Sequence, residues 1–210
     1  MRVLPPRPPA TASTGGRTAP LVAALWVFGL ATGLGTGCYT GSAKETSWPR
    51  IEREPGWSLV RVPYIPQQEE EDCGAAALAM ATAYWKAPLA REEIVRQKPP
   101  QDGGIRAGDL RDLARQRGFE AFLVQGTFHD FDKQLALGRP LIVGTGKPIL
   151  GGKVSLHYEV IVGFNRTTQH VLSWDPALGL REYSPEAFAR EWAPSDRLTL
   201  ILFKPGVTPG

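Results

Sequence analysis

Hydrophobic and polar positions along the chain divide it into three stretches. Residues 1–37 hold a short apolar run at 21–30 behind a proline-rich segment. Residues 38–57 are rich in Gly, Ser, Thr, Pro and charge without apolar periodicity, so they predict a flexible tether. From residue 58 to residue 206, apolar runs alternate with turn residues, which is typical of one folded domain.

The first half of the predicted domain is mainly helical. Residues 73–86 are apolar nearly all the way round, which indicates a buried central helix. A short helix is expected over 91–97, and an amphipathic one over 105–117 with Gly118 as its cap. Two further helices are expected over 130–137, closed by Gly138, and from Pro185 to Trp192 with Ser184 as N-cap.

The second half carries most of the predicted strands. Helices precede strands, without the strand–helix alternation of a doubly wound fold, so the pattern predicts an α+β fold with helices packed on an antiparallel sheet. The expected strands are 58–64, 119–124, 141–143, 157–164, 171–174 and 198–203.

Charge separates the N-terminal segment from the rest. The net charge is +3, and residues 1–37 contain Arg2, Arg7 and Arg17 but no acidic residue. The other 21 basic residues balance the 21 acidic ones. No basic face or stripe is visible, so a nucleic-acid partner is not expected.

The N-terminal segment predicts export. Arginines, an apolar run and small residues ending at Gly37 fit a secretory signal. The following Cys38 resembles the lipidated cysteine of bacterial lipoproteins, although Gly35 stands where that motif usually has Leu. We therefore expect a lipid-anchored protein that faces the periplasm or cell exterior. The alternatives are a secreted form or an uncleaved anchor, for which 21–37 is short of the roughly 20 apolar residues of a span.

The chain has two cysteines, Cys38 and Cys73. Export would permit a disulfide between them. Acylation of Cys38 would instead leave Cys73 as the one free thiol of the domain.

Cys73 has the setting of a nucleophile. A polar segment that carries Gln67 ends at Cys73, which opens the alanine-rich helix. A helix N-terminus favours the thiolate form of cysteine. The amide of an upstream glutamine can donate to a developing oxyanion. This pattern indicates a cysteine hydrolase.

A cysteine nucleophile needs a base and a group that orients the base. Of the three histidines, His129 is expected at a helix start and His170 in an exposed turn. His157 opens an apolar strand after the loop at Gly151-Gly152, where a first strand residue can face a cleft. Taken alone, such a histidine is more often structural.

Asp175 lies 18 residues after His157, at the end of the next predicted strand. Antiparallel pairing would bring its carboxylate beside the imidazole. Asp-Pro is also a common turn initiator. The order Gln, Cys, His and Asp, taken together, is what favours a catalytic set.

These residues resemble the double-glycine leader peptidases, the papain-like domains at the N-termini of bacteriocin-exporting ABC transporters and in stand-alone relatives. The resemblance covers roughly 60–204 and is carried by Gln67 to Met80, His157-Tyr158 and Asp175-Pro176. It implies a papain-like α+β fold, with Cys73 as nucleophile, His157 as base and Asp175 as its orienting group. Gln67 and the Cys73 backbone N–H would form the oxyanion hole, with Gln68 as a competitor one position away. No metal or other cofactor is implied.

The acidic run from Glu69 to Asp72 departs from a simple thiolate site. Negative charge beside Cys73 opposes thiolate formation, and a solvated loop is the expected reading. The functional hypothesis is a subsite for basic residues of a substrate.

The sequence thus predicts a membrane-tethered cysteine peptidase that acts on exported peptides or proteins. Two alternatives stay open: an amidase or acyltransferase with the same triad, and a peptide-binding lipoprotein without turnover. Peptide and membrane are the expected partners, and the oligomeric state stays open.

Overall fold

The computed structural model describes residues 41–149 and 153–208. The described residues form one compact unit. The predicted signal segment and Cys38 lie outside the described residues. In the described ranges, no helix has the length and apolar character needed to cross a membrane.

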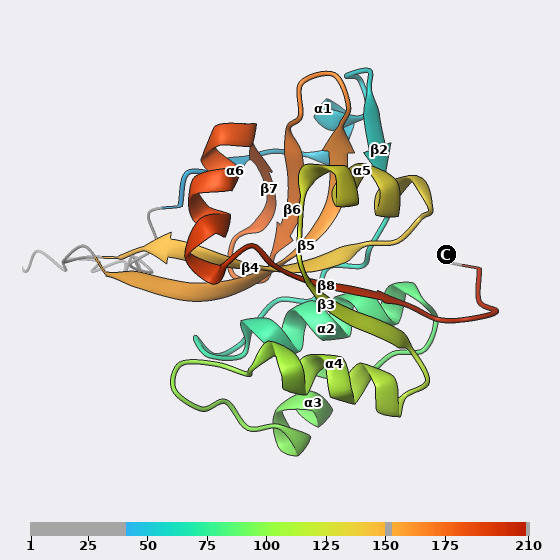
Figure 1. Ribbon diagram of the computed structural model, residues 1–210, viewed down its shortest axis with the longest axis vertical. Coiled ribbons are helices and arrows are strands. Elements are labelled where there is room, and N and C mark those ends of the chain that lie inside the picture. Colours follow the sequence, from blue (N-terminus) through green and yellow to red (C-terminus); the bar gives the residue numbers. More distant parts are fainter. Residues whose placement is uncertain (1–40, 150–152, 209–210) are drawn as a thin grey trace, which may run out of the picture. The chain divides into compact units, whose positions relative to one another are not determined.

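Within the described ranges, an antiparallel sheet of eight strands forms the body of the domain (Figure 1). The strand order is β1-β7-β6-β5-β4-β8-β3, and β2 pairs with the C-terminal end of β5. The predicted α+β class is confirmed. The strands are β1 (Lys44–Glu45), β2 (Trp57–Leu59), β3 (Glu120–Gln125), β4 (Leu141–Pro148), β5 (Val154–Asn165), β6 (Val171–Asp175), β7 (Gly179–Tyr183) and β8 (Leu198–Phe203).

Helices cover the sheet on both sides. In Figure 1, α2, α3 and α4 gather below β4, β8 and β3, while α5 and α6 lie above them. Except for Ala83, every residue of α2 is buried, as the all-round apolar pattern predicts. The helices are α1 (Trp48–Ile51), α2 (Cys73–Tyr84), α3 (Arg91–Gln97), α4 (Ala107–Gln116), α5 (Phe128–Ala136) and α6 (Pro185–Trp192), followed by the 3-10 turn η1 (Ala193–Ser195).

Local signals at the helix ends explain most of these boundaries. Gly118 and Gly138 have positive φ angles of 72° and 68°, which glycine adopts at low cost, so both predicted caps are confirmed. The Ser184 hydroxyl accepts a hydrogen bond from the Ala187 N–H, as expected for an N-cap. A capping box of Thr127 and Asp130 starts α5 two residues earlier than predicted.

The prediction of a tether over 38–57 is wrong from Gly41 on. Strand β1 pairs with β7, and Ile51 of α1 is completely buried. The Trp48 ring packs edge-on against Trp174, with centroids 6.0 Å apart. These contacts join residues more than 100 positions apart, so the polar local pattern of 41–57 could not reveal them.

The β4–β5 hairpin is longer than predicted. Strand β4 continues past Val143 to Pro148, and the pairing runs out to Pro148 opposite Val154. Gly146 interrupts the apolar pattern because η1 packs against it: a Cβ there would lie 2.7 Å from a Pro194 carbon. His157 is therefore the fourth residue of β5, opposite Thr145, and not the first as predicted.

Candidate active site

Cys73 is the first residue of α2 and is 3% exposed. Its thiol is free. Gly74 follows because β5 lies so close: a Cβ at this position would be 3.1 Å from the Tyr158 ring. The missing side chain thus allows the N-terminus of α2 to approach the strand that carries His157.

His157 and Asp175 are held together behind the thiol. The His157 Nε2 and Asp175 Oδ1 atoms are 2.9 Å apart, and both side chains are buried. Burial lowers the pKa of His157, but hydrogen bonds with Asp175 and Cys73, and the charges of both groups, raise it further, to about 10. The ring is therefore stabilised as an imidazolium between a carboxylate and the sulfur.

Asp175 forms hydrogen bonds with the β6–β7 turn as well as with His157. Its Oδ1 atom also accepts hydrogen bonds from the backbone N–H groups of Ala177 (2.8 Å) and Leu178 (3.3 Å). Burial raises the pKa of Asp175, yet the His157 hydrogen bond and the charges of His157 and Lys147 lower it below its ordinary value. Asp175 thus both begins the turn, as the Asp-Pro pattern suggests, and contacts His157 through the same oxygen.

Gln67 is fixed beside the same turn. Its backbone N–H donates to the Pro176 carbonyl at 3.0 Å, and the Tyr64 hydroxyl donates to the same oxygen at 3.0 Å. The Gln67 side-chain Oε1 is buried and accepts no hydrogen bond within the described residues. Gln68 is exposed and faces a pocket whose lining does not include Cys73.

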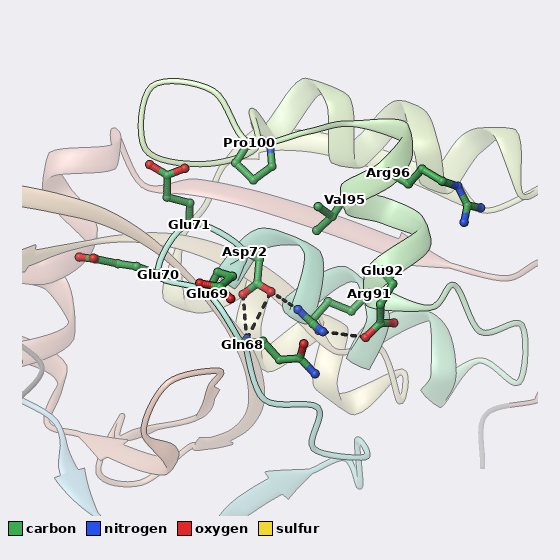
Figure 2. Close-up of a pocket in the computed structure, with 10 residues that line it drawn as sticks. All are labelled: Gln68, Glu69, Glu70, Glu71, Asp72, Arg91, Glu92, Val95, Arg96 and Pro100. Atoms are coloured by element: carbon green, nitrogen blue, oxygen red, sulfur yellow. Dashed lines mark hydrogen bonds and ion pairs between the residues drawn. The ribbon is translucent and has the colours of Figure 1, made fainter. Parts of the chain in front are cut away.

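The acidic run is only partly solvated. Glu69, Glu70 and Glu71 are exposed, whereas Asp72 is 2% exposed and forms an ion pair with Arg91 of α3. Figure 2 shows the Asp72 carboxylate between the Arg91 guanidinium and the backbone of Gln68. The acid next to the nucleophile is thus neutralised by a buried arginine, which corrects the expectation of a uniformly solvated loop.

Two small pockets flank the cysteine and the histidine. One, of about 240 Å³, is lined by Cys73, Tyr158 and the 101–106 loop. The other, of about 220 Å³, is lined by His157, Glu70 and Glu71. Both include Leu156, which is 63% exposed. The pocket drawn in Figure 2 is larger, about 700 Å³, but contains neither Cys73 nor His157.

The other two histidines lie outside this site. His129 is exposed on α5, and His170 Nδ1 contacts Glu182 Oε1 at 2.8 Å. Sequence analysis missed Arg91 and Lys147, since an isolated basic residue carries no local signal of its buried partners. Within the described ranges there is no group of three His, Cys, Asp or Glu residues suited to a metal ion.

The fold, together with the family match, is that of a papain-like cysteine peptidase. Residues 61–205 match the model of the Peptidase C39 family, and the chain belongs to that family. The predicted resemblance to the double-glycine leader peptidases is confirmed at this level.

The chain is also similar to a part of two longer proteins. The chain is 30% identical over 129 residues to the transport/processing ATP-binding protein ComA of Streptococcus pneumoniae, covering 61% of this chain and 17% of ComA. It is 30% identical over 132 residues to the mesentericin-Y105 transport/processing protein MesD of Leuconostoc mesenteroides, covering 63% of this chain and 18% of MesD. The chain thus spans less than a fifth of the length of these relatives.

Solved structures share the fold. A double glycine motif protease from an AMS/PCAT transporter, in complex with the leader peptide, is 26% identical with a TM-score of 0.54, covering 69% of this chain and 92% of that one. A C39-like peptidase from Bacillus anthracis has a TM-score of 0.56 at 18% identity, covering 70% and 97%. The second likeness supports the fold alone.

Proposed function

We propose that this protein hydrolyses peptide bonds with Cys73 as nucleophile, His157 as acid–base group and Asp175 as the residue that orients His157. The observation that carries the proposal is the buried His157–Asp175 pair, with Nε2 and Oδ1 2.9 Å apart, next to the free thiol of Cys73, with one pocket lined by Cys73 and another by His157. A nucleophile, its base and a third group that fixes the base form the constellation that covalent acyl transfer requires.

The reaction follows from this arrangement. The Cys73 thiolate attacks the carbonyl carbon, and the His157 imidazolium gives its proton to the leaving amine as the C–N bond breaks. His157 then takes a proton from water, whose oxygen attacks the thioester carbon. The thioester C–S bond breaks, so the acid product leaves and the thiolate–imidazolium pair returns. The Gln67 amide, whose backbone is fixed at Pro176, and the Cys73 backbone N–H would stabilise the oxyanion.

The proposed substrate is an extended peptide with small residues beside the reacting bond. The pockets lined by Cys73 and by His157 are separate and measure about 240 and 220 Å³, which suits a peptide that lies across both. A solved relative is described as a double glycine motif protease with a bound leader peptide, which agrees with small residues at this place. We expect hydrolysis of peptides with Gly-Gly before the bond to exceed hydrolysis of matched Leu-Leu peptides, with no hydrolysis by Cys73→Ala. Turnover of small amides but not of extended peptides would instead indicate an amidase.

We also propose that the site prefers substrates with basic residues. Glu70 and Glu71 line the pocket that holds His157, whereas Glu69 lines only the pocket away from it. Exposed ion pairs contribute about 1 kcal/mol at most, so Glu70→Gln with Glu71→Gln should lower kcat/KM for a basic peptide up to about fivefold. Glu69→Gln is the matched control. Equal values for basic and neutral peptides in all variants would contradict the subsite.

We also propose export and a lipid anchor at Cys38. The chain is packed on the domain from Gly41 on, so only residues 38–40 would separate the anchor from the fold. Three extended residues span about 10 Å, which would hold the domain close to the bilayer. Cys38→Ser should release the protein from the membrane fraction, and retention of that variant would contradict a lipid anchor at this residue.

A further inference from the structure

A completely buried lysine lies directly behind the proposed triad. Lys147 of β4 is 1% exposed, and its Nζ atom is 3.9 Å from Asp175 Oδ2. The Oδ1 atom of Asp175 is already occupied by His157 and the turn backbone. The Oδ2 atom accepts no hydrogen bond from the described residues, so the Lys147 ammonium is the positive charge that faces it.

Two further carboxylates hold the lysine in place. The Nζ atom of Lys147 is 2.6 Å from Glu159 Oε1 and 2.8 Å from Glu191 Oε2, and it also donates to the Tyr183 hydroxyl. Lys147, Glu159, Glu191 and Tyr183 are here called the lysine cluster. Burial lowers the pKa of Lys147, but the three nearby carboxylates raise it more, so the ammonium is retained.

The cluster is fixed from several elements. Glu159 of β5 accepts hydrogen bonds from Thr145 at 3.1 Å, Ser173 at 2.5 Å and Tyr183 at 2.8 Å. Glu191 of α6 accepts hydrogen bonds from Ser42, in the segment before β1. The position of the ammonium relative to Asp175 is therefore set by β4, β5, β6, β7 and α6 together.

A contribution to folding stability does not explain why Lys147 and its carboxylate partners are buried here. Buried ion pairs contribute little net stability compared with apolar residues of similar volume. A fully buried Asp175 with the Glu159 carboxylate nearby would tend to take up a proton. An adjacent cation opposes that uptake. Ionised Asp175 is also what stabilises the His157 imidazolium.

We propose that Lys147 is a positioning residue of the peptidase: it keeps Asp175 ionised and leaves Oδ1 free to orient His157. This inference rests on the proposed peptidase function. The charged and titratable groups that face Asp175 or the lysine cluster are His157 and Glu159 from β5, Lys147 from β4, Tyr183 from β7, Glu191 from α6, Tyr64 before α2, and Cys73 through His157.

The test is the pH dependence of Cys73 alkylation by iodoacetamide and of kcat/KM. Lys147→Met removes the positive charge and keeps the chain length. Without the cation, Asp175 and the thiolate–imidazolium pair of Cys73 and His157 take up protons more readily. The acid limb of both pH profiles, where the rate falls as the pH is lowered, should therefore move up by about one pH unit. Glu191→Gln removes a negative charge from the same lysine, so its acid limb should stay in place or move down. Lys147→Arg should restore the wild-type limb.

A merely structural role would give a different result. Both Lys147→Met and Glu191→Gln would then unfold at lower temperature, with acid limbs that coincide with wild type, and that result would overturn the inference. If Lys147→Met does not fold, Lys147→Met with Glu191→Gln removes a cation and an anion together, and its limb should still move up. An unmoved limb in that variant also overturns the inference. If wild-type Cys73 reacts no faster than a free thiol, the proposed function itself fails.

Discussion

Two sets of polar residues meet at one face of β5, and only one of them borders the pockets at Cys73 and His157. We call Gln67, Cys73, His157 and Asp175 the open group, and the lysine cluster the closed group. His157 lies beside Cys73 and lines one of these pockets, whereas Glu159, two residues on, belongs to the lysine cluster, which lines neither of them. Asp175 links the two sets, because its Oδ1 atom is 2.9 Å from His157 Nε2 and its Oδ2 atom is 3.9 Å from Lys147 Nζ. We therefore expect the open group to meet the substrate and the closed group to act on the chemistry through Asp175.

The largest effect outside the triad itself is expected at the open group. Gln67→Ala should lower kcat by about 10²–10³, because it removes one of the two proposed oxyanion donors. Gln68→Ala is the matched control and should stay near wild type, since Gln68 faces a pocket without Cys73. Steady-state kinetics on one peptide measures both. A larger loss for Gln68→Ala would reverse the assignment of the donor.

The titration of His157 tests the link between the two groups. Its pKa is raised from 6.5 to about 10, so its contribution to stability is complete below pH 6.5 and is lost as the pH rises toward 10. In Cys73→Ala, where the sulfur is gone, the ring should lose its proton at least one pH unit lower. NMR of the imidazole carbons measures this. Equal titration in both proteins would disprove the coupling to Cys73.

The smallest effect is expected at the far end of the closed group. Ser42→Ala removes the hydroxyl that donates to Glu191 Oε1 at 2.5 Å, which should cost about 1 kcal/mol of unfolding free energy. The rate of Cys73 alkylation should stay unchanged. Ser47→Ala is the control, since its side chain caps no helix N–H. A changed alkylation rate in Ser42→Ala would show that the closed group reaches the chemistry from its outer end.

The open group was readable from the sequence and the closed group was not. Gln67, Cys73, His157 and Asp175 follow one another in an order and spacing that a helix start and two adjacent strands explain. Lys147 stands alone between Gly146 and Pro148, and its partners come from β5, β7 and α6. Such long-range pairing leaves no periodic trace. Strand β1 and helix α1 were also not predicted, because their contacts are long-range and their polar residues indicated a tether.

The predicted end of strand β4 was wrong because a glycine inside the strand is required by close packing. Gly146 reads as a loop residue, yet η1 requires it inside β4. Strand β7 was missed because its short stretch Gly179–Tyr183 mixes apolar and charged residues. Helix positions were closer to prediction, since α2 and α6 carry local apolar and capping signals.

Cys73 is proposed to react as a thiolate that is paired with the His157 imidazolium. Alkylation of the purified protein by iodoacetamide at pH 6, compared with His157→Ala, tests it most directly. A free thiol is mostly protonated at this pH, because its ordinary pKa is about 8.5. We predict rapid alkylation of the wild type at Cys73 and a loss of at least tenfold in His157→Ala. Equal, slow alkylation of both proteins would disprove the thiolate–imidazolium pair.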